Sequence, residues 1–208
     1  MRLIGSSLSP FVRRVGVSLN QLGIAFEHDP VGVFAKPSAV RKYNPVVRVP
    51  TLVLDDGEAL IDSAAILDEI DQMVGPRRAL MPAKGPARRQ AMKLTAIAVG
   101  ASEKAVAAFY EGRFHPAEKV HQPWVDHNDG QAVGGFAYLN KIARGLGEGE
   151  WLAGTPKLSQ ADITAATGFA FAHRVRPGLN LPRRMPALAK LARRLEALPA
   201  FQAMPLPE

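Results

Sequence analysis

Strand-like patterns are confined to the first third of this sequence, and that one-sided distribution constrains the fold more than any single motif does. Before residue 75, short apolar runs of strand length alternate with segments of helical periodicity. Residues 75–86, "GPRRALMPAKGP", hold three prolines and two glycines, which is typical of a connection. Beyond them the sequence is alanine-rich and shows helical periodicity only. We therefore predict an α/β domain at residues 1–75, a linker at 76–84 and an all-helical domain at 85–208.

The beginning of the chain predicts two strands joined by a helix. "RLIG" at residues 2–5 has the length and apolar content of a short buried strand, and "IAFEHDP" at residues 24–30 is a second. Between them, residues 10–23 carry apolar side chains every three to four positions. Pro10 suits the first position of a helix and Gly23 suits its stop. We therefore expect a β-α-β unit here.

Residues 49–62, "VPTLVLDDGEALID", contain two further strand-like runs. They are joined through Asp56-Gly57, a dipeptide that strongly favours a hairpin turn. Residues 63–74, "SAAILDEIDQMV", then show the periodicity of a helix. The expected order of the α/β domain is β-α-β-α-β-β-α, in which the early strands need crossover connections and the last two form an antiparallel hairpin.

The second part of the chain predicts helices alone. The second helical segment is interrupted by glycines, and there is no internal repeat. The expected helical segments are residues 87–113, 122–146, 158–175 and 185–198.

The composition excludes several kinds of site. The chain has no cysteine, so it has no disulfide, no Cys-based zinc site and no protein thiol as nucleophile. No apolar run approaches the roughly 20 residues that span a membrane. The N-terminal "MRLIGSSLSP" lacks the apolar core of a signal peptide, so we expect a cytoplasmic protein with no membrane partner. His115, His121 and His127 fall on different helical faces, and we expect no metal site.

The net charge of +7 comes entirely from the second part of the chain. Residues 1–80 hold nine basic and nine acidic side chains, whereas residues 81–208 hold 17 basic and 10 acidic ones. Such an excess occurs in proteins that bind nucleic acid or another anionic partner, and equally on the solvated faces of helices. Because the basic segment 183–194 also has an ordinary apolar stripe, we favour solvated helices and expect no nucleic-acid partner.

Three serines crowd the place where the first strand gives way to the first helix. They are Ser6, Ser7 and Ser9 in "GSSLSPFVRRV". A turn built only for shape would more often use Gly, Asn or Asp. The serines therefore either cap the helix or hold an anion at its N-terminus.

Pro50 stands immediately before a predicted strand. Proline cannot donate to a central ladder, so it could mark an edge strand. Alternatively the Val49–Pro50 bond is cis, which would turn the backbone N–H and C=O of Val49 outwards, free for an extended peptide ligand. The proline rules alone favour the edge strand over the cis bond.

Asp62 and Ser63 stand where a strand becomes a helix. Ser63 could simply be the N-cap. Alternatively its hydroxyl and the unpaired N–H groups of the helix start would receive a ligand carboxylate, while Asp62 holds an ammonium group. A carboxyl and a hydroxyl in this arrangement suit the zwitterionic end of an amino acid.

Ser159 and Asp162 in "LSQADI" have the spacing of a capping box, with the short Asp in place of the usual Glu or Gln. We interpret this pair as structural, because the arrangement by itself satisfies orphan donors at a helix start.

Taken together, these motifs resemble those of the glutathione S-transferase family. The strings "SPFVRRV", "NPVVRVPTLVLDDG", "LIDSAAILDEI", "WLAGTPKLSQADI" and "MPALAKLARRLEALPAF" occur in the family's order and spacing over essentially the whole chain. The residues of the first string, "SPFVRRV", are typical of bacterial members of the serine type. The resemblance implies a thioredoxin-like N-terminal domain, a helical C-terminal domain, a homodimer and glutathione as co-substrate.

The resemblance also implies a role for each residue of these motifs. Ser9 matches the hydroxyl that stabilises the thiolate of glutathione, with Ser6 and Ser7 as the remaining candidates. Pro50 matches a cis-proline that lets Val49 pair with the cysteinyl backbone, and the acid–Ser pair holds the γ-glutamyl end. The expected glutathione-binding residues are Ser9, Phe11, Arg48, Val49, Pro50, Asp62 and Ser63.

The chain departs from the family pattern in several places. Asp62 replaces the commoner Glu and is one carbon shorter, while Arg48 stands where many members carry Lys or Gln and could still reach the glycyl carboxylate. Val47 replaces a frequent glycine, with no consequence evident from the sequence. The absence of cysteine excludes the cysteine-type chemistry of some classes.

The expected activity is conjugation of glutathione to a small hydrophobic electrophile, with Phe109, Tyr110 and His115 as candidates for that second pocket. Two alternatives stay open. One is glutathione-dependent reduction of peroxides or disulfides, and the other is a non-catalytic binding protein that keeps the fold. Retention of the whole set of glutathione-binding residues favours a working glutathione site.

Overall fold

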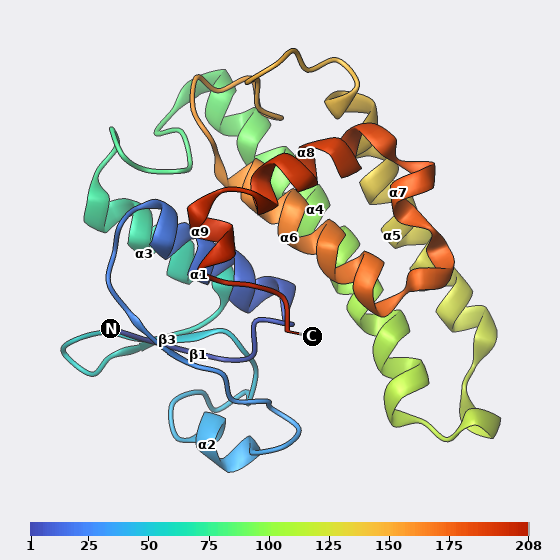
Figure 1. Ribbon diagram of the computed structural model, residues 1–208. Helices are drawn as coiled ribbons and strands as arrows, with labels where there is room; N and C mark the ends of the chain where they lie inside the picture. The colour runs from blue at the N-terminus through green and yellow to red at the C-terminus, as the bar shows by residue number, and fades with distance from the viewer. Residues whose placement is uncertain (208) are drawn as a thin grey trace. The chain divides into compact units, whose positions relative to one another are not determined.

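The computed structural model describes residues 1–207 and divides the chain into two compact units (Figure 1). The first unit comprises residues 1–83 together with the segment that begins at Ala197, and the second comprises residues 84–196. Within residues 1–207, no helix is long and apolar enough to cross a membrane.

A four-stranded sheet in the order β2-β1-β3-β4 forms the centre of the first unit. β1 (Arg2–Ile4) runs parallel to β2 (Glu27–Asp29) and antiparallel to β3 (Thr51–Val53). β4 (Ala59–Leu60) pairs antiparallel with β3. The strands are short, and the core side chains Leu3, Ile4 and Leu52 on β1 and β3 are at 1% exposure or less.

Three helices accompany these strands; the first two connect strands and the third follows β4. They are α1 (Pro10–Gln21), α2 (Pro37–Arg41) and α3 (Ser63–Val74). α1 packs against α3 and β1, and α3 packs against β3; Figure 1 shows α1 and α3 on one side of the sheet and α2 on the other. The order β-α-β-α-β-β-α is confirmed, and the domain is thioredoxin-like.

The predicted hairpin is also confirmed. Gly57 has a φ of +92°, which an L-residue with a side chain rarely adopts. The Asp56 carboxylate accepts from the N–H of Glu58 at 2.9 Å, and Leu54 N–H donates to the carbonyl of Glu58 at 2.8 Å. The Asp-Gly pair thus supplies both the side-chain acceptor and the backbone freedom that the turn requires.

The last described residues pack on α1 in the first unit. α9 (Pro199–Gln202) contacts α1, and the Nε of Arg13 donates to the carbonyl of Met204 at 2.8 Å. A Cβ on Gly16 would lie 2.8 Å from the Met204 sulfur, so the glycine makes room for this segment. The division therefore differs from the expected one, which placed all of residues 85–208 in the helical domain.

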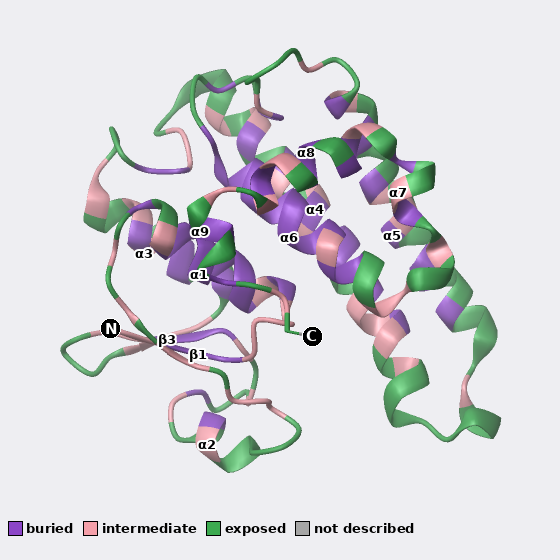
Figure 2. Ribbon diagram, viewed as in Figure 1, coloured by how far each residue is buried: buried purple, intermediate pink, exposed green. Residues whose placement is uncertain are grey.

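The second unit is helical throughout, as expected. α4 (Gly85–Phe114) packs against α5 (Gln122–Ala143) and α6 (Gln160–Val175), and α6 packs against α8 (Pro186–Glu196). Figure 2 shows that α6 is buried along most of its length. The shorter elements are the 3-10 turns η1 (Ala117–Lys119) and η2 (Pro177–Leu179) and the helix α7 (Leu181–Arg184).

The glycines in α5 do not interrupt the helix. A Cβ on Gly135 would lie 2.8 Å from the Cβ of Ala101 on α4. A Cβ on Gly168 of α6 would lie 2.2 Å from the Ser102 hydroxyl of α4. Gly135 and Gly168 therefore let α5 and α6 approach α4 closely, whereas an added Cβ on Gly130 or Gly134 would meet nothing within 4 Å.

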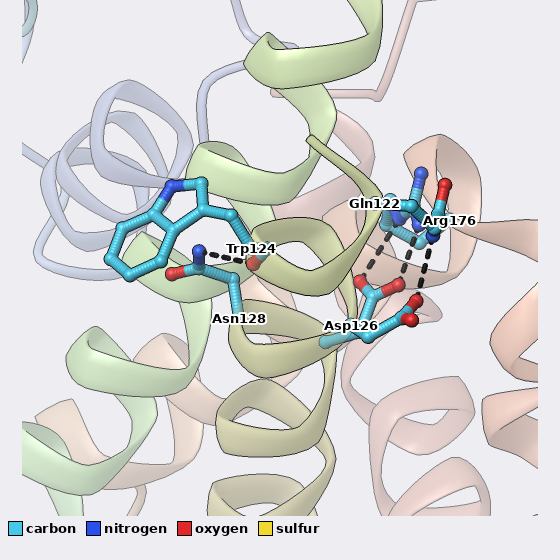
Figure 3. Close-up of polar contacts among 6 residues, drawn as sticks. Gln122, Trp124, Asp126, Asn128 and Arg176 are labelled. Carbon is cyan, nitrogen blue, oxygen red and sulfur yellow. Dashed lines mark hydrogen bonds and ion pairs between the residues drawn. The ribbon is translucent and has the colours of Figure 1, made fainter. Parts of the chain in front are cut away.

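Polar contacts at the start of α5 tie it to the end of α6 (Figure 3). The guanidinium of Arg176, the residue after α6, pairs with both carboxylate oxygens of Asp129, and the Nε distance is 3.0 Å. Nearer the surface, Gln122 donates to Asp126 within the first turn at 2.7 Å. Asn128 is fully buried and donates to the carbonyl of Trp124 at 2.8 Å.

The capping box at the start of α6 is present as predicted. The Asp162 carboxylate accepts from the N–H and the hydroxyl of Ser159, at 3.0 and 2.7 Å, and from the N–H of Leu152 at 2.8 Å. Burial raises the pKa of Asp162, and the hydrogen bonds from Ser159 and Leu152 act in the opposite direction. The box thus anchors the chain before α6 as well as the helix itself.

Candidate functional site

The serine-rich loop ends in the N-cap of α1. The Ser9 hydroxyl accepts from the N–H of Val12 at 3.4 Å, and the Ser6 hydroxyl accepts from the N–H of Leu8 at 3.2 Å. Both serines are half-buried. The Ser7 side chain makes no hydrogen bond within residues 1–207. The capping interpretation is therefore confirmed for Ser9, whose long bond to Val12 leaves the hydroxyl proton free to donate outwards.

Gly5 brings this loop against the loop of Val49. Its φ is +135°, and an added Cβ would lie 2.5 Å from the Val12 side chain and 2.8 Å from the Cβ of Val49. Only a glycine fits this approach without displacing one of its neighbours. The Nε2 of His28 donates to the Gly5 carbonyl at 2.8 Å and so holds the loop from β2.

The Val49–Pro50 bond is cis, so the edge-strand interpretation that the proline rules favoured is wrong and the one implied by the resemblance is confirmed. Pro50 is buried and Val49 is half-buried. The backbone N–H and C=O of Val49 make no hydrogen bond within residues 1–207. Val49 therefore presents an unpaired peptide edge directly beside Gly5.

Two residues that precede this bond carry features that the sequence did not reveal. Asn44 is 1% exposed and its amide donates to the carbonyl of Arg48 at 2.8 Å, which anchors the loop. Val47 has a φ of +54°, in the left-handed region where a β-branched residue is an outlier. This conformation explains why a glycine is suited to position 47. The Arg48 side chain is exposed.

Asp62, and not Ser63, is the N-cap of α3. Its carboxylate accepts from the N–H of Ala64 at 2.8 Å, and Ser63 is the first helical residue. The capping role that sequence reasoning offered for Ser63 is therefore wrong, because the Asp one position earlier already satisfies the helix donor. The Ile61–Asp62 peptide bond is cis. Asp62 is exposed to solvent.

The Ser63 hydroxyl is held from α1. Arg14 is 3% exposed, and its Nε and Nη2 donate to the Ser63 oxygen at 3.2 and 2.7 Å. Ser63 itself is 1% exposed. Sequence reasoning missed Arg14, because the two residues are 49 positions apart and an arginine on an amphipathic helix gives no local signal of such a contact.

The structure thus gathers most of the predicted site residues in the first unit. Gly5 joins the loop of Ser9 to Val49, and Arg14 joins α1 to Ser63. Phe11 lies half-buried in the first turn of α1.

The three candidates in the second unit lie at the end of α4. The Phe109 and Tyr110 rings are 5.9 Å apart, and Tyr110 meets the ring of Phe114 edge-on at 5.2 Å. The imidazole of His115 lies 3.3 Å from the carboxylate of Glu111. Within residues 1–207, no group of three or more His, Cys, Asp or Glu side chains is arranged to hold a metal ion.

The comparisons with known proteins agree with this geometry. Residues 3–78 match the family model described as the glutathione S-transferase N-terminal domain. The GST-like protein YibF of Escherichia coli, described as uncharacterized, is 30% identical over 209 positions, which cover 97% of this chain and 96% of that protein. The chain belongs to the glutathione S-transferase family.

Solved structures of glutathione S-transferases show the same fold over the whole chain. The enzyme of Methylobacterium radiotolerans, in complex with glutathione sulfonate, is 28% identical with a TM-score of 0.88 and covers 100% of this chain and 95% of its own. That of Methylobacillus flagellatus, with glutathione bound, is 25% identical with the same TM-score of 0.88 and 98% coverage of each chain.

Proposed function

We propose that this glutathione S-transferase binds glutathione in its first unit and conjugates it to a small hydrophobic electrophile. The observation that carries the proposal is the unpaired backbone of Val49 beside the serine loop. An extended peptide can pair with that N–H and C=O as an added strand would. Glutathione is such a peptide, and relatives with the same fold were crystallised with glutathione or its sulfonate.

Each end of the tripeptide has a matching group in the first unit. The N-terminus of α3 offers unpaired N–H groups and a partial positive charge to the carboxylate of the γ-glutamyl group, with the Ser63 hydroxyl beside them. The exposed Asp62 carboxylate pairs with the ammonium group. Arg48 binds the glycyl carboxylate, and Phe11 packs against the bound peptide.

Ser9 stabilises the thiolate. A free thiol of this kind titrates near about 8.5 and is mostly protonated at neutral pH. A hydroxyl hydrogen bond at the N-terminus of α1 favours the charged form. Lowering the pKa by ~2 units corresponds to roughly 2.7 kcal/mol, within reach of one charge-assisted bond and a helix end. The thiolate then attacks the electrophilic carbon, and the leaving group departs with its electron pair.

The aromatic residues at the end of α4 supply the pocket for the electrophile. Phe109 and Tyr110 form an aromatic surface, and His115 adds a polar edge. Aromatic side chains of this kind contact apolar compounds favourably. Tyr110→Ala should therefore raise the KM for a chlorinated nitroaromatic and leave the KM for glutathione unchanged.

Calorimetric titration with glutathione tests the binding site. We expect saturable binding that weakens sharply in Asp62→Ala, while Asp56→Ala, which alters an exposed carboxylate of the hairpin, serves as the matched control. Absence of binding by the wild-type protein would refute the proposal.

Turnover separates the transferase from the alternative activities. We expect conjugation of a chlorinated nitroaromatic, with a much larger loss of turnover than of glutathione affinity in Ser9→Ala. Turnover of peroxides or disulfides alone would assign the reductive activity instead, and glutathione binding without any turnover would assign a binding role.

A further inference from the structure

We infer that Arg14 is a positioning residue that makes Ser63 a hydrogen-bond donor only, and that it thereby selects ligands with a carboxylate at the γ-glutamyl position. The inference rests on the proposed function and names the residue behind one part of its specificity. The juxtaposition that carries it is the buried guanidinium of α1 beneath the first residue of α3.

The hydrogen bonds fix which way the Ser63 hydroxyl can act. A hydroxyl group has one proton to donate and two lone pairs to accept with. The Nε and Nη2 of Arg14 both donate to the Ser63 oxygen, at 3.2 and 2.7 Å, and so the guanidinium covers the accepting side of the hydroxyl. The remaining function of the hydroxyl is its proton, which can only be given to an acceptor.

The position of Ser63 indicates which kind of acceptor its hydroxyl proton can bind. Ser63 is the first residue of α3, and its backbone N–H makes no hydrogen bond within residues 1–207. The N–H and the hydroxyl are therefore two donors on one residue, which match the two oxygens of a carboxylate. An apolar group or an ammonium at this place has no acceptor atom and would leave them unpaired, at the cost of an unsatisfied buried donor.

Arg14 is held rigidly enough to keep the Ser63 hydroxyl a hydrogen-bond donor. It is 3% exposed, and the Ser18 hydroxyl donates to its backbone carbonyl at 2.7 Å within α1. A planar guanidinium presents its donors in a fixed geometry, so one rotamer of Arg14 fixes both contacts. The neighbouring Arg13 has a different task, since its Nε binds the carbonyl of Met204.

A pair of ligands tests the inference directly. The affinity of glutathione is compared with that of γ-aminobutyryl-cysteinylglycine, which lacks only the α-carboxylate of the γ-glutamyl group. The wild-type protein should prefer glutathione. Arg14→Met should reduce this preference about tenfold or more, as expected when a hydrogen bond to a charged group is lost, and should do so through the affinity for glutathione alone.

Arg13→Met is the matched control, because it removes a buried guanidinium from the same helix without touching Ser63. It should leave the preference between the two ligands unchanged. A structural role for Arg14 predicts a different result, namely equal losses of affinity for both ligands in Arg14→Met, and that result would overturn the inference.

A second variant keeps the test decisive if Arg14→Met does not fold. Arg14→Gln retains one donor and should keep an intermediate preference, whereas a preference equal to that of the wild type would count against the inference. In a Ser63→Ala background, Arg14→Gln should cause no further change in preference. If the wild-type protein binds neither ligand, the proposed function fails; if it binds both equally, only the inference about Arg14 and Ser63 fails.

Discussion

At the scale of single residues, the first unit depends on side chains whose contacts are distant in sequence. Gly5 is needed because Val12 and Val49 converge on it, and Asn44 holds the carbonyl of Arg48 from a buried position. Neither requirement can be recognised from the neighbours in the sequence. The roles of such residues follow from tertiary packing, which a single sequence does not display.

Val47 is a point of local strain that a substitution should relieve. Its φ of +54° costs a β-branched residue about 1–2 kcal/mol, whereas glycine adopts this region freely but loses more entropy on folding. We expect Val47→Gly to raise the free energy of unfolding by about 0.5–1 kcal/mol in urea denaturation.

Val46→Gly is the control for that substitution, because Val46 is exposed and has no positive φ. It should lower the stability slightly. Destabilisation by Val47→Gly to the same extent would show that the backbone at position 47 is not strained.

Removal of the Ser9 hydroxyl should change the pH dependence of the reaction. Without it, the thiolate of bound glutathione loses a hydrogen bond that favours the charged form, so its pKa rises. In Ser9→Ala at saturating glutathione, the apparent pKa in the profile of kcat/KM for the electrophile against pH should move upward by about one to two units. The same profile in Ser7→Ala should match the wild type; a shift in Ser7→Ala and none in Ser9→Ala would transfer the role to Ser7.

At the scale of elements, the sequence predicts the order of strands and helices well, because periodicity and turn residues are local signals. The Asp56-Gly57 hairpin and the capping box of Ser159 and Asp162 are present as expected. The errors concern one helix start and one helix interior. The N-cap of α3 is Asp62 where Ser63 was considered, and α5 continues through its glycines.

Within the candidate site, the residues that carry local sequence signals are predicted, and those whose partners are distant in sequence are not. Local motifs identify Ser9, Val49 and the pair at the start of α3, since each stands at the end of an element. Arg14 is invisible to such reasoning, because its partner is 49 residues away on another helix. Recognising it requires the packing of α1 against α3.

Asp162 should contribute strongly to the stability of the helical unit. In Asp162→Asn, only one of the two side-chain atoms can accept, so buried donors of either Ser159 or Leu152 lose their acceptor. We expect a loss of about 2–3 kcal/mol in the free energy of unfolding, measured by urea denaturation. Asp126→Asn, at an exposed carboxylate of α5, should change the stability little, and equal effects of the two substitutions would contradict this account.

At the scale of the whole molecule, apolar side chains exposed on the helical unit suggest an interface between two copies of the chain. Met92 of α4 is 50% exposed and Tyr138 of α5 is 38% exposed. We expect light scattering to give twice the 22.4 kDa mass of the chain. Tyr138→Glu should shift the protein to the monomer; a wild-type protein that is monomeric at all concentrations would exclude the homodimer.

The segment that begins at Ala197 belongs to the first unit, and this has a consequence for folding during protein synthesis. The carbonyl that accepts from Arg13 belongs to Met204, 191 residues later in the sequence. At translation rates of about 5–20 residues per second, roughly 10–40 s pass between the synthesis of the two groups. During that interval α1 can lie on its sheet, but the surface destined for α9 stays uncovered. A nascent chain on the ribosome therefore holds an unfinished thioredoxin-like domain until the helical unit has been made.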